Sequence, residues 1–572
     1  MRSIALSLAL CVLCVAPALS ETQPNSLIGL WGGEKNFGPE ISGTLTIART
    51  SSGLEARIGT IHTSVTVAGE ELRFALADNK GKFRGRLHGG TLGGFWIQPA
   101  TPVLGVEYAS PIAFAGTKDS WTGTVAPLAD RLTLYLSIYP RADGQLAAFL
   151  RNPEMNFGRG HELTVTQSGS DVTLTDTKTH NPIMSGRFDS GMLTLTTRGS
   201  NVSFVFARRD PATAVGFNER APERPTVYTP PPVDDDGWKT GSLADAHIDA
   251  DAIDALARGI ADTKAAAGAT PYIDALLIAR HGRLLFEDYF DGFDKNTPHT
   301  LRSAGKTLTS ILLGAAIDHG APIALTTPVT SLFSGPFANP DPRKDKITIE
   351  NLLTMSSGLA CDDDDDNSPG NEDTMQNQTA EPDWYKYTLD LPMVRAPGEK
   401  AVYCSGGVNV AYGALRNATR RWVPELFDDY LARPLDIKRY DMNLTPTGDA
   451  YGGGGIFIAP RDALKFGQLY LDGGMWNGRR VVSKAWVDAS TATHAKIHDD
   501  STYGYNWWLF KLKVGDRVYD EFEAGGNGGQ IIAVVPALDT VILITAANYG
   551  RFDIWYKFQT DMIPNVILPA MK

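Results

Sequence analysis

Cysteine and basic residues are scarce in this sequence of 572 residues, and their scarcity excludes several classes of protein. The chain has four Cys, and its ten His residues are scattered without an H-E-x-x-H pattern. A four-ligand zinc site is therefore not expected, and we predict neither a metal nor a cofactor. Lys and Arg number 53 against 65 Asp and Glu, a net charge of −12. Because such a surface repels phosphate groups, the composition argues against a nucleic-acid partner.

Long apolar runs are also scarce, and one lies at the N-terminus. Residues 4–15 follow the basic start Met1-Arg2 and precede the small-x-small sequence Ala18-Leu19-Ser20. This arrangement is typical of a secretory signal peptide, which we place at residues 1–20; the alternative is an N-terminal membrane anchor. No later stretch has membrane-spanning length, so the sequence predicts no transmembrane segment and a periplasmic or secreted protein.

Residues 21–217 are expected to form an all-β domain. Apolar and polar residues alternate between glycine-rich turns in several short runs, for example at residues 42–47, 131–136 and 202–206. This period of two indicates half-buried antiparallel strands, and no long helical pattern interrupts them. Tryptophan-containing segments at residues 30–32 and 120–123 open two similar halves. We therefore interpret the domain as a barrel or sandwich, with an internal duplication as a further hypothesis.

A Pro- and Asp-rich segment, residues 218–239, is predicted to link this domain to a second one at residues 240–572. Repeated Pro holds a chain extended, as is typical of a linker. Beyond it, residues 248–266 have helical periodicity, and residues 276–287 indicate a β-hairpin. Further helical patterns and then several strands follow. One antiparallel sheet completed from both ends of the domain, together with a helical lobe, gives an α+β fold class.

A candidate nucleophile and base lie at the start of a predicted helix. Ser303 and Lys306 are three residues apart, so their side chains share a helix face at about 5–6 Å. The helix dipole favours a developing alkoxide at Ser303, and a buried Lys306 would lose its proton readily. The pair therefore suits nucleophilic catalysis, although an N-cap serine with a solvated lysine has the same spacing. Apolar residues such as Leu308 and Ile311 give this helix one buried face.

A second candidate segment contains Tyr403 and Ser405, ahead of another predicted helix. A tyrosine beside an ammonium group has its phenolate favoured and relays protons. The alternative is a core tyrosine at a helix start.

A third segment is the glycine-rich turn Asn527-Gly528-Gly529, which opens a predicted strand at Gln530. Glycine lets a ligand approach the backbone closely. The backbone N–H groups of Ser303 and Gln530 are then the predicted oxyanion hole; an ordinary hairpin turn is the alternative.

In this order, the three segments resemble the motifs of the serine β-lactamase and penicillin-binding protein superfamily. The resemblance is to its class C-like branch, with the family VIII carboxylesterases and the 6-aminohexanoate-dimer hydrolases, and it covers about residues 240–572. It implies that Ser303 attacks a carbonyl carbon, that Lys306 and Tyr403 act as general base and acid, and that water cleaves the acyl-enzyme. Ser405 and the Asn527 turn would bind substrate.

Two positions depart from the family's pattern. Asn527 stands where Lys, His or Trp begins the third motif, and Ser405 stands where enzymes that recognise amides often have Asn. An uncharged Asn527 provides no clamp for the carboxylate of a penicillin. The favoured function is therefore an exported serine hydrolase whose substrate is a carboxylic ester or small amide. The alternatives are a DD-peptidase or β-lactamase-type penicillin-binding protein, and a catalytically silent protein whose β domain binds an envelope component.

An acidic run at residues 362–366 follows the predicted helix end near Leu359. A solvated loop is the favoured interpretation, and a site for Ca²⁺ or a substrate amine is the alternative. Cys361 borders this run, and Cys404 adjoins Tyr403. Either the two form one disulfide, which would join the acidic loop to the tyrosine, or they are separate buried thiols.

Overall fold

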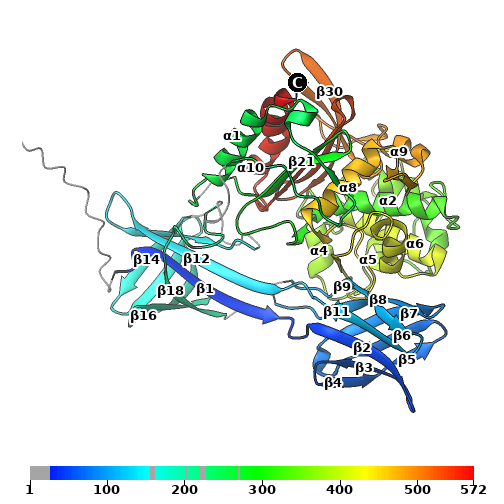
Figure 1. Ribbon diagram of the computed structural model, residues 1–572, viewed down its shortest axis with the longest axis horizontal. Coiled ribbons are helices and arrows are strands. Elements are labelled where there is room, and N and C mark those ends of the chain that lie inside the picture. The colour runs from blue at the N-terminus through cyan, green and yellow to red at the C-terminus, as the bar shows by residue number, and fades with distance from the viewer. Residues whose placement is uncertain are drawn as a thin grey trace, which may run out of the picture.

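The computed structural model describes residues 26–102, 104–154, 162–199, 202–218, 227–267 and 271–571. The predicted signal peptide lies outside these residues. Figure 1 shows an all-β N-terminal region, in two units side by side, and a larger C-terminal domain that combines helices with a sheet. The predicted α+β fold class, with an all-β N-terminal part, is confirmed. Among the described residues, no helix has the length and apolar character needed to cross a membrane.

One N-terminal unit is a closed eight-stranded barrel that is sealed by the first strand of the chain. Alternate side chains point inward, so that Leu134, Leu136 and Ile138 are buried around Trp31. The barrel strands, in spatial order, are β1 (Gly29–Gly38), β12 (Asp130–Pro140), β13 (Leu146–Arg151), β14 (Leu163–Ser168), β15 (Asp171–Asp176), β16 (Pro182–Asp189), β17 (Met192–Thr197) and β18 (Ser203–Arg209).

The other N-terminal unit packs two sheets around Phe83, Trp96 and Trp121. The first sheet consists of β10 (Ala115–Thr117), β11 (Ser120–Val125), β2 (Gly43–Thr50), β3 (Gly53–Ile58) and β4 (Ile61–Ser64). The second includes β5 (Thr66–Ala68), β6 (Glu71–Ala75), β7 (Lys82–His88), β8 (Thr91–Gln98) and β9 (Tyr108–Ala113). Trp31 and Trp121 therefore lie in units of different strand order, and the duplication stays a hypothesis.

The C-terminal domain is built on a nine-stranded sheet that receives strands from both ends of the domain. Its order is β19 (Lys239–Thr240), β21 (Arg283–Tyr289), β20 (Ile273–Arg280), β32 (Thr540–Ala546), β31 (Gln530–Val535), β30 (Arg517–Gly526), β29 (Trp508–Val514), β28 (Thr502–Tyr503) and β27 (Ala495–Lys496). One face packs on α1 (Ala250–Ala261), α10 (Phe552–Lys557) and the following π-helix (Phe558–Ile567). The other face packs on α8 (Pro460–Leu471) and the helical lobe.

The helical lobe surrounds α2 (Gly305–Asp318), the helix that follows the candidate nucleophile. Every residue of α2 from Gly305 to Ala316 is buried, so the expectation of a single buried face was wrong. The helix is covered on all sides because it lies between the sheet and the rest of the lobe. The other helices are α3 (Ile349–Leu353), α4 (Glu372–Asn377), α5 (Trp384–Asp390), α6 (Ser405–Thr419), α7 (Val423–Phe427) and α9 (Lys484–Ser490); the hairpin β25 (Met475–Trp476) and β26 (Arg479–Arg480) follows α8.

A continuous sheet joins the second N-terminal unit to the C-terminal domain. Strand β9 pairs with β23 (Tyr440–Asn443), which pairs through β24 (Phe457–Ile458) with β22 (His299–Thr300). Strand β22 ends only three residues before Ser303. The Phe95 ring also packs edge-on against Trp422 at 5.3 Å between centroids. The N-terminal region thus supports the backbone that carries the candidate nucleophile.

The described part of the predicted linker, residues 227–239, lies along the C-terminal domain and is held by ion pairs. Arg461 of α8 binds Asp234 and Asp236 at 2.9 and 3.0 Å, and Lys438 binds Asp235 at 2.7 Å. Trp238 is buried against Trp476. The acidic residues of this segment therefore have a structural role.

A buried ion pair between Arg151 of the barrel and Asp291 of the C-terminal domain generates a stability prediction. Both side chains are at most 1% exposed, and Arg151 also lies over the Tyr272 ring. Arg151→Met leaves the carboxylate buried without its partner, so we expect unfolding to become easier by about 3–5 kcal/mol. Chemical denaturation followed by circular dichroism measures this. The exposed Arg187→Met is the control, and equal stability of both variants contradicts the prediction.

Candidate active site

Ser303 lies in a single 3₁₀ turn, Arg302–Ala304, that leads directly into α2. The backbone of Arg302 has a left-handed φ of 48°, an uncommon conformation for a residue with a Cβ atom. One turn into the helix, Lys306 is buried, and its Nζ donates to Ser303 Oγ at 2.8 Å. The alternative of an N-cap serine with a solvated lysine is thus excluded by geometry.

The glycine run at residues 452–455 completes the surroundings of Lys306. The Gly453 carbonyl oxygen accepts a second hydrogen bond from Lys306 Nζ at 2.8 Å. A Cβ atom on Gly454, whose φ is +130°, would stand 2.3 Å from the Arg302 carbonyl oxygen. Only glycine lets the two backbones approach this closely, so the run is required for the nucleophile turn to form.

Tyr403 shares this site with Ser303 and Lys306. Its ring lies 4.9 Å from Lys306 Nζ and stacks on Trp508 at 5.6 Å. Burial raises the pKa of Tyr403, and the opposing charge of Lys306 does not reverse the shift. Burial lowers the pKa of Lys306, but its interactions with Tyr403 and with the carboxylates of Glu372 and Asp363 oppose it and leave the pKa above its ordinary value. The site therefore favours a protonated Lys306 beside a neutral tyrosine, whereas the sequence suggested that burial would make the lysine neutral.

Ser303 and Tyr403 open into a cavity of about 810 Å³. Its walls combine acidic and aromatic side chains, and neither Lys nor Arg is among the described residues that line it. The lining residues are Ser303, Asp363, Asp364, Glu372, Tyr403, His498, Asp499, Asp500, Ser501, Trp508, Phe510, Glu523, Gly525, Gly526, Asn527, Phe552, Trp555, Tyr556 and Gln559.

The third predicted segment lies only partly at this cavity. Gly526 at the end of β30 packs against the nucleophile turn, where an added Cβ atom would meet the Ala304 nitrogen at 3.0 Å. Asn527 is exposed and lines the cavity, whereas Gln530 is fully buried and its side chain bonds to the backbone of Ala546. The role of the Gln530 backbone N–H in the oxyanion hole stays a prediction, and the backbone N–H of Asn527, a residue at the cavity wall, is a second candidate donor.

Gly528 and Gly529 do not line the cavity either. Cβ atoms on them would meet the rings of Tyr549 and Phe558 at 2.7 and 2.8 Å. Their small size therefore serves close packing of the turn against the C-terminal helices, and the predicted substrate contact is corrected.

The acidic run enters the site through Asp363. Its carboxylate accepts bonds from the Ser405 nitrogen and hydroxyl at 2.7 and 2.6 Å, and from the Glu372 nitrogen at 2.9 Å. Burial, with the nearby charge of Glu372, raises the pKa of Asp363 to about 6. Ser405 is fully buried and does not line the cavity, so it acts by orienting Asp363. The interpretation of the run as a solvated loop holds for Asp364, Asp365 and Asp366, which are exposed.

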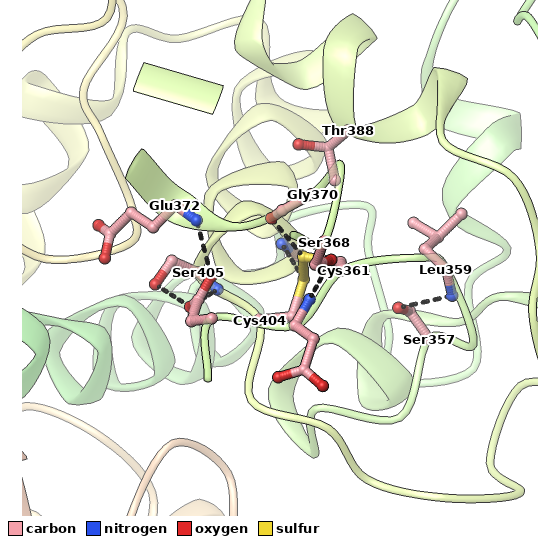
Figure 2. The surroundings of a disulfide bond; sticks show 12 residues. Ser357, Leu359, Cys361, Ser368, Gly370, Glu372, Thr388, Cys404 and Ser405 are labelled. Atoms are coloured by element: carbon pink, nitrogen blue, oxygen red, sulfur yellow. Dashed lines mark hydrogen bonds between the residues drawn. A yellow bond between two sulfur atoms is a disulfide. The ribbon is translucent and has the colours of Figure 1, made fainter. Parts of the chain in front are cut away.

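A disulfide between Cys361 and Cys404 joins the acidic loop to the tyrosine segment. Figure 2 shows the bond between Cys361 and Cys404, with Ser368, Gly370 and Ser405 beside it. The Asp363 nitrogen adds a bond of 2.9 Å to the Tyr403 carbonyl oxygen. These links fix Asp363 and Tyr403 relative to each other.

The β-lactamase family model matches residues 253–553, more than half of the chain. The chain belongs to the β-lactamase family. The predicted membership of its class C-like superfamily and the predicted enzyme class, a β-lactamase-related serine hydrolase, are confirmed. The match begins after the N-terminal β units.

Among curated proteins, the chain is 27% identical over 346 residues to the 6-aminohexanoate-dimer hydrolase of Paenarthrobacter ureafaciens, covering 55% of this chain and 82% of that protein. It is also 27% identical over 290 residues to the D-alanyl-D-alanine-carboxypeptidase/endopeptidase AmpH of Escherichia coli (strain K12), covering 44% and 72%. Among solved structures, EstCE1, a hydrolase with promiscuous acyltransferase activity, aligns at 14% identity and a TM-score of 0.45, covering 58% and 100%.

Several members of the site could not be found from the sequence. The sequence contained a signal for Asp363, because this residue lies two positions after Cys361, and a disulfide from Cys361 to Cys404 would bring its loop to Tyr403. Glu372, Glu523 and Gln559 had none, since each is brought in from a separate element. Over the described residues, no group of three or more His, Cys, Asp or Glu side chains is arranged to hold a metal.

The disulfide closes a loop between positions 43 residues apart, which predicts a contribution to stability. Loss of this cross-link is expected to lower the free energy of unfolding by about 4 kcal/mol, because the unfolded chain gains freedom. Calorimetry of a Cys361→Ser/Cys404→Ser variant measures this. Dithiothreitol should destabilise the natural protein and leave the variant unchanged; two free thiols in the natural, non-reduced protein would contradict the prediction.

Proposed function

We propose that this protein is an exported serine hydrolase that cleaves a carboxylic ester or small amide through an acyl-enzyme on Ser303. The observation that carries the proposal is the 2.8 Å hydrogen bond between buried Lys306 and Ser303, at the wall of a cavity that Tyr403 also lines. Nucleophile and base within hydrogen-bond reach are the signature of nucleophilic catalysis. The relatives named above support an amide or ester as substrate class.

The proposed reaction has two steps. When the Lys306–Tyr403 pair has lost one proton, Ser303 Oγ attacks the carbonyl carbon and gives its own proton to the pair, and the backbone N–H groups of Ser303 and Asn527 stabilise the oxyanion. The pair then delivers the proton to the leaving oxygen or nitrogen. Water enters, loses a proton to the same pair and attacks the acyl carbon. The bond from the acyl carbon to Ser303 Oγ then breaks, and the pair returns the proton to Ser303 Oγ.

A DD-peptidase or β-lactamase activity is the alternative within the family. The similarity to AmpH favours it. The described part of the cavity wall speaks against it, because it has carboxylate side chains, which repel an anionic substrate, and neither Lys nor Arg. Stable acylation by penicillin would move the assignment to this alternative.

Export and the role of the N-terminal region are further parts of the proposal. Export rests on the N-terminal sequence and on the Cys361–Cys404 disulfide, which persists in oxidising compartments. An envelope component is the proposed partner of the β units. A catalytically silent envelope-binding protein is the alternative, and labelling of Ser303 would exclude it.

Labelling tests the nucleophile. After incubation with a fluorophosphonate, intact mass spectrometry should find one adduct in the natural protein and none in Ser303→Ala. Turnover of p-nitrophenyl butyrate should fall at least about a thousandfold in that variant. Ser331→Ala, at an exposed serine of the same domain, is the control. Full turnover by Ser303→Ala would rule out the proposed nucleophile, and no adduct on any protein would favour the silent alternative.

The raised pKa values of Lys306 and Tyr403 predict how the rate depends on pH. Attack needs the deprotonated pair, which becomes more abundant as pH rises, so kcat/KM should increase from neutral to alkaline pH. Asp363→Asn removes a negative charge that raises the pKa of Lys306. The increase should therefore move to lower pH, by about one pH unit.

The two profiles should converge below the pKa of Asp363, which is about 6, because the natural side chain is then neutral as well. Exposed Asp366→Asn is the control and should leave the profile unchanged. An Asp363→Asn profile that coincides with the natural one at every pH would contradict the electrostatic coupling to Lys306.

A further inference from the structure

The second N-terminal unit contributes side chains to a row of contacts that ends beside the candidate nucleophile. Strand β9 lies where this unit meets the C-terminal domain (Figure 1) and pairs with β23. In the register of the next strands, Asp441 of β23 stands opposite Phe457 of β24, and Phe457 stands opposite Thr300 of β22. Side chains that are directly opposite in a sheet lie on the same face and contact each other. The row therefore crosses from the N-terminal unit into the catalytic domain.

The row begins with a buried hydrogen bond between Ser110 and Asp441. The Ser110 hydroxyl donates to one carboxylate oxygen of Asp441, and the other oxygen is buried without a hydrogen-bond partner among the described atoms. Asp441 is fully buried, and burial raises the pKa of its carboxyl to about 6. At neutral pH this buried carboxylate therefore relies on the Ser110 hydroxyl, and their bond fixes β9 relative to β23.

Tyr108 supports the middle of the row. It lies two residues from Ser110, on the same face of β9, and it is buried. Its ring meets Phe457 edge-on at 5.6 Å between centroids, with 78° between the planes. Burial raises the pKa of Tyr108, and the positive charge of Arg302 acts in the opposite direction. The tyrosine thus contacts β24 and lies within electrostatic reach of the residue before Ser303.

The far end of the row holds the backbone of Arg302. Thr300 Oγ1 accepts a bond from the Arg302 nitrogen at 3.3 Å, and the Arg302 carbonyl oxygen accepts one from the Gly455 nitrogen at 3.2 Å. The left-handed φ of 48° at Arg302 costs free energy in a residue with a Cβ atom, and it persists only where the surroundings hold it. A shift of β22 or β24 would let Arg302 relax and would move Ser303 Oγ away from Lys306.

We propose that Tyr108 and Ser110 are positioning residues for Ser303, and that the row they begin keeps the nucleophile turn in the form that brings its hydroxyl to Lys306. Both lie outside residues 253–553, which the family model matches. The second N-terminal unit thereby sets the activity of the catalytic domain. This assignment rests on the proposed function, since it concerns the same nucleophile.

Other contacts hold the second N-terminal unit against the catalytic domain. Glu425 binds Arg86 at 3.4 Å, and the guanidinium of Arg84 lies 4.7 Å from the centre of the Trp422 ring. These residues do not belong to the row. A variant at Tyr108 should therefore keep the unit docked and test the row alone.

Replacement of the Tyr108 ring tests the proposal. Tyr108→Leu should lower both kcat for p-nitrophenyl butyrate and the rate at which a fluorophosphonate labels Ser303, each at least about tenfold, because a small displacement of reacting atoms is costly. KM should stay within about a factor of two, since the cavity wall is unchanged. Tyr108→Phe keeps the ring against Phe457 and should restore the natural values. Phe74→Leu, in the core of the same unit on β6, is the matched control and should keep the natural kcat.

Ser110→Ala is a smaller change and takes the place of Tyr108→Leu if that variant does not fold, as circular dichroism will show. It removes the only described hydrogen-bond donor to the Asp441 carboxylate, so the same loss of kcat with little change in KM is expected. Natural kcat and natural labelling rate in the folded variants overturn the positioning role.

Hydrogen exchange separates this proposal from the proposed hydrolysis, because it needs no turnover. In Tyr108→Leu, amide exchange in the peptide of residues 299–305 should become at least about tenfold faster, and in Phe74→Leu it should stay natural. Unchanged exchange in Tyr108→Leu overturns the positioning role. Faster exchange there, in a protein whose natural form neither takes the label nor cleaves any ester, overturns the proposed function alone.

Discussion

The active site depends on one buried lysine whose ammonium group has to be satisfied without water. Lys306 meets this need with bonds to Ser303 Oγ and the Gly453 carbonyl oxygen. Next to Gly453, the Gly454 backbone packs against Arg302, where an added Cβ atom would lie 2.3 Å from the carbonyl oxygen, and Arg302 itself has a left-handed backbone. The same glycine run therefore contacts both the Lys306 ammonium group and the turn that carries Ser303.

Two carboxylates, Asp363 and Glu523, lie at different parts of the active-site cavity. Asp363 lies close to Lys306, oriented by Ser405 and by the disulfide one residue beyond Tyr403, and it raises the pKa of that lysine. Glu523 of β30 lies elsewhere on the cavity wall, and its buried Oε2 atom has no hydrogen-bond partner among the described atoms. Asp363 is the carboxylate suited to tuning the catalytic pair. Neither Lys nor Arg is among the described residues that line the cavity, which distinguishes this arrangement from one built to hold an anionic substrate.

The N-terminal units are structurally continuous with the catalytic domain. Strands β9, β23, β24 and β22 form one hydrogen-bonded sheet that ends three residues before Ser303, and the Arg151–Asp291 pair ties the barrel to the hairpin side of the domain. The buried ion pair and the continuous sheet both require the N-terminal units and the catalytic domain to lie in a fixed position relative to each other. The N-terminal region, which lies outside the residues that the family model matches, therefore constrains the nucleophile turn.

The sequence by itself determined the features that are local in the chain. Period-two runs predicted the strands, the spacing of Ser303 and Lys306 predicted a shared helix face, and the order of three motifs predicted the family. Tertiary structure decided everything that depends on partners distant in sequence. Periodicity says that Glu521 and Glu523 share a face, but not that this face meets Gln559 and the cavity. The glycine turn was found from the sequence, but only the packing of β30 against the 3₁₀ turn brings Asn527, and not the Gln530 side chain, to the cavity wall. The helix α2 was expected to expose one side, and only the packing of the lobe around it explains its complete burial.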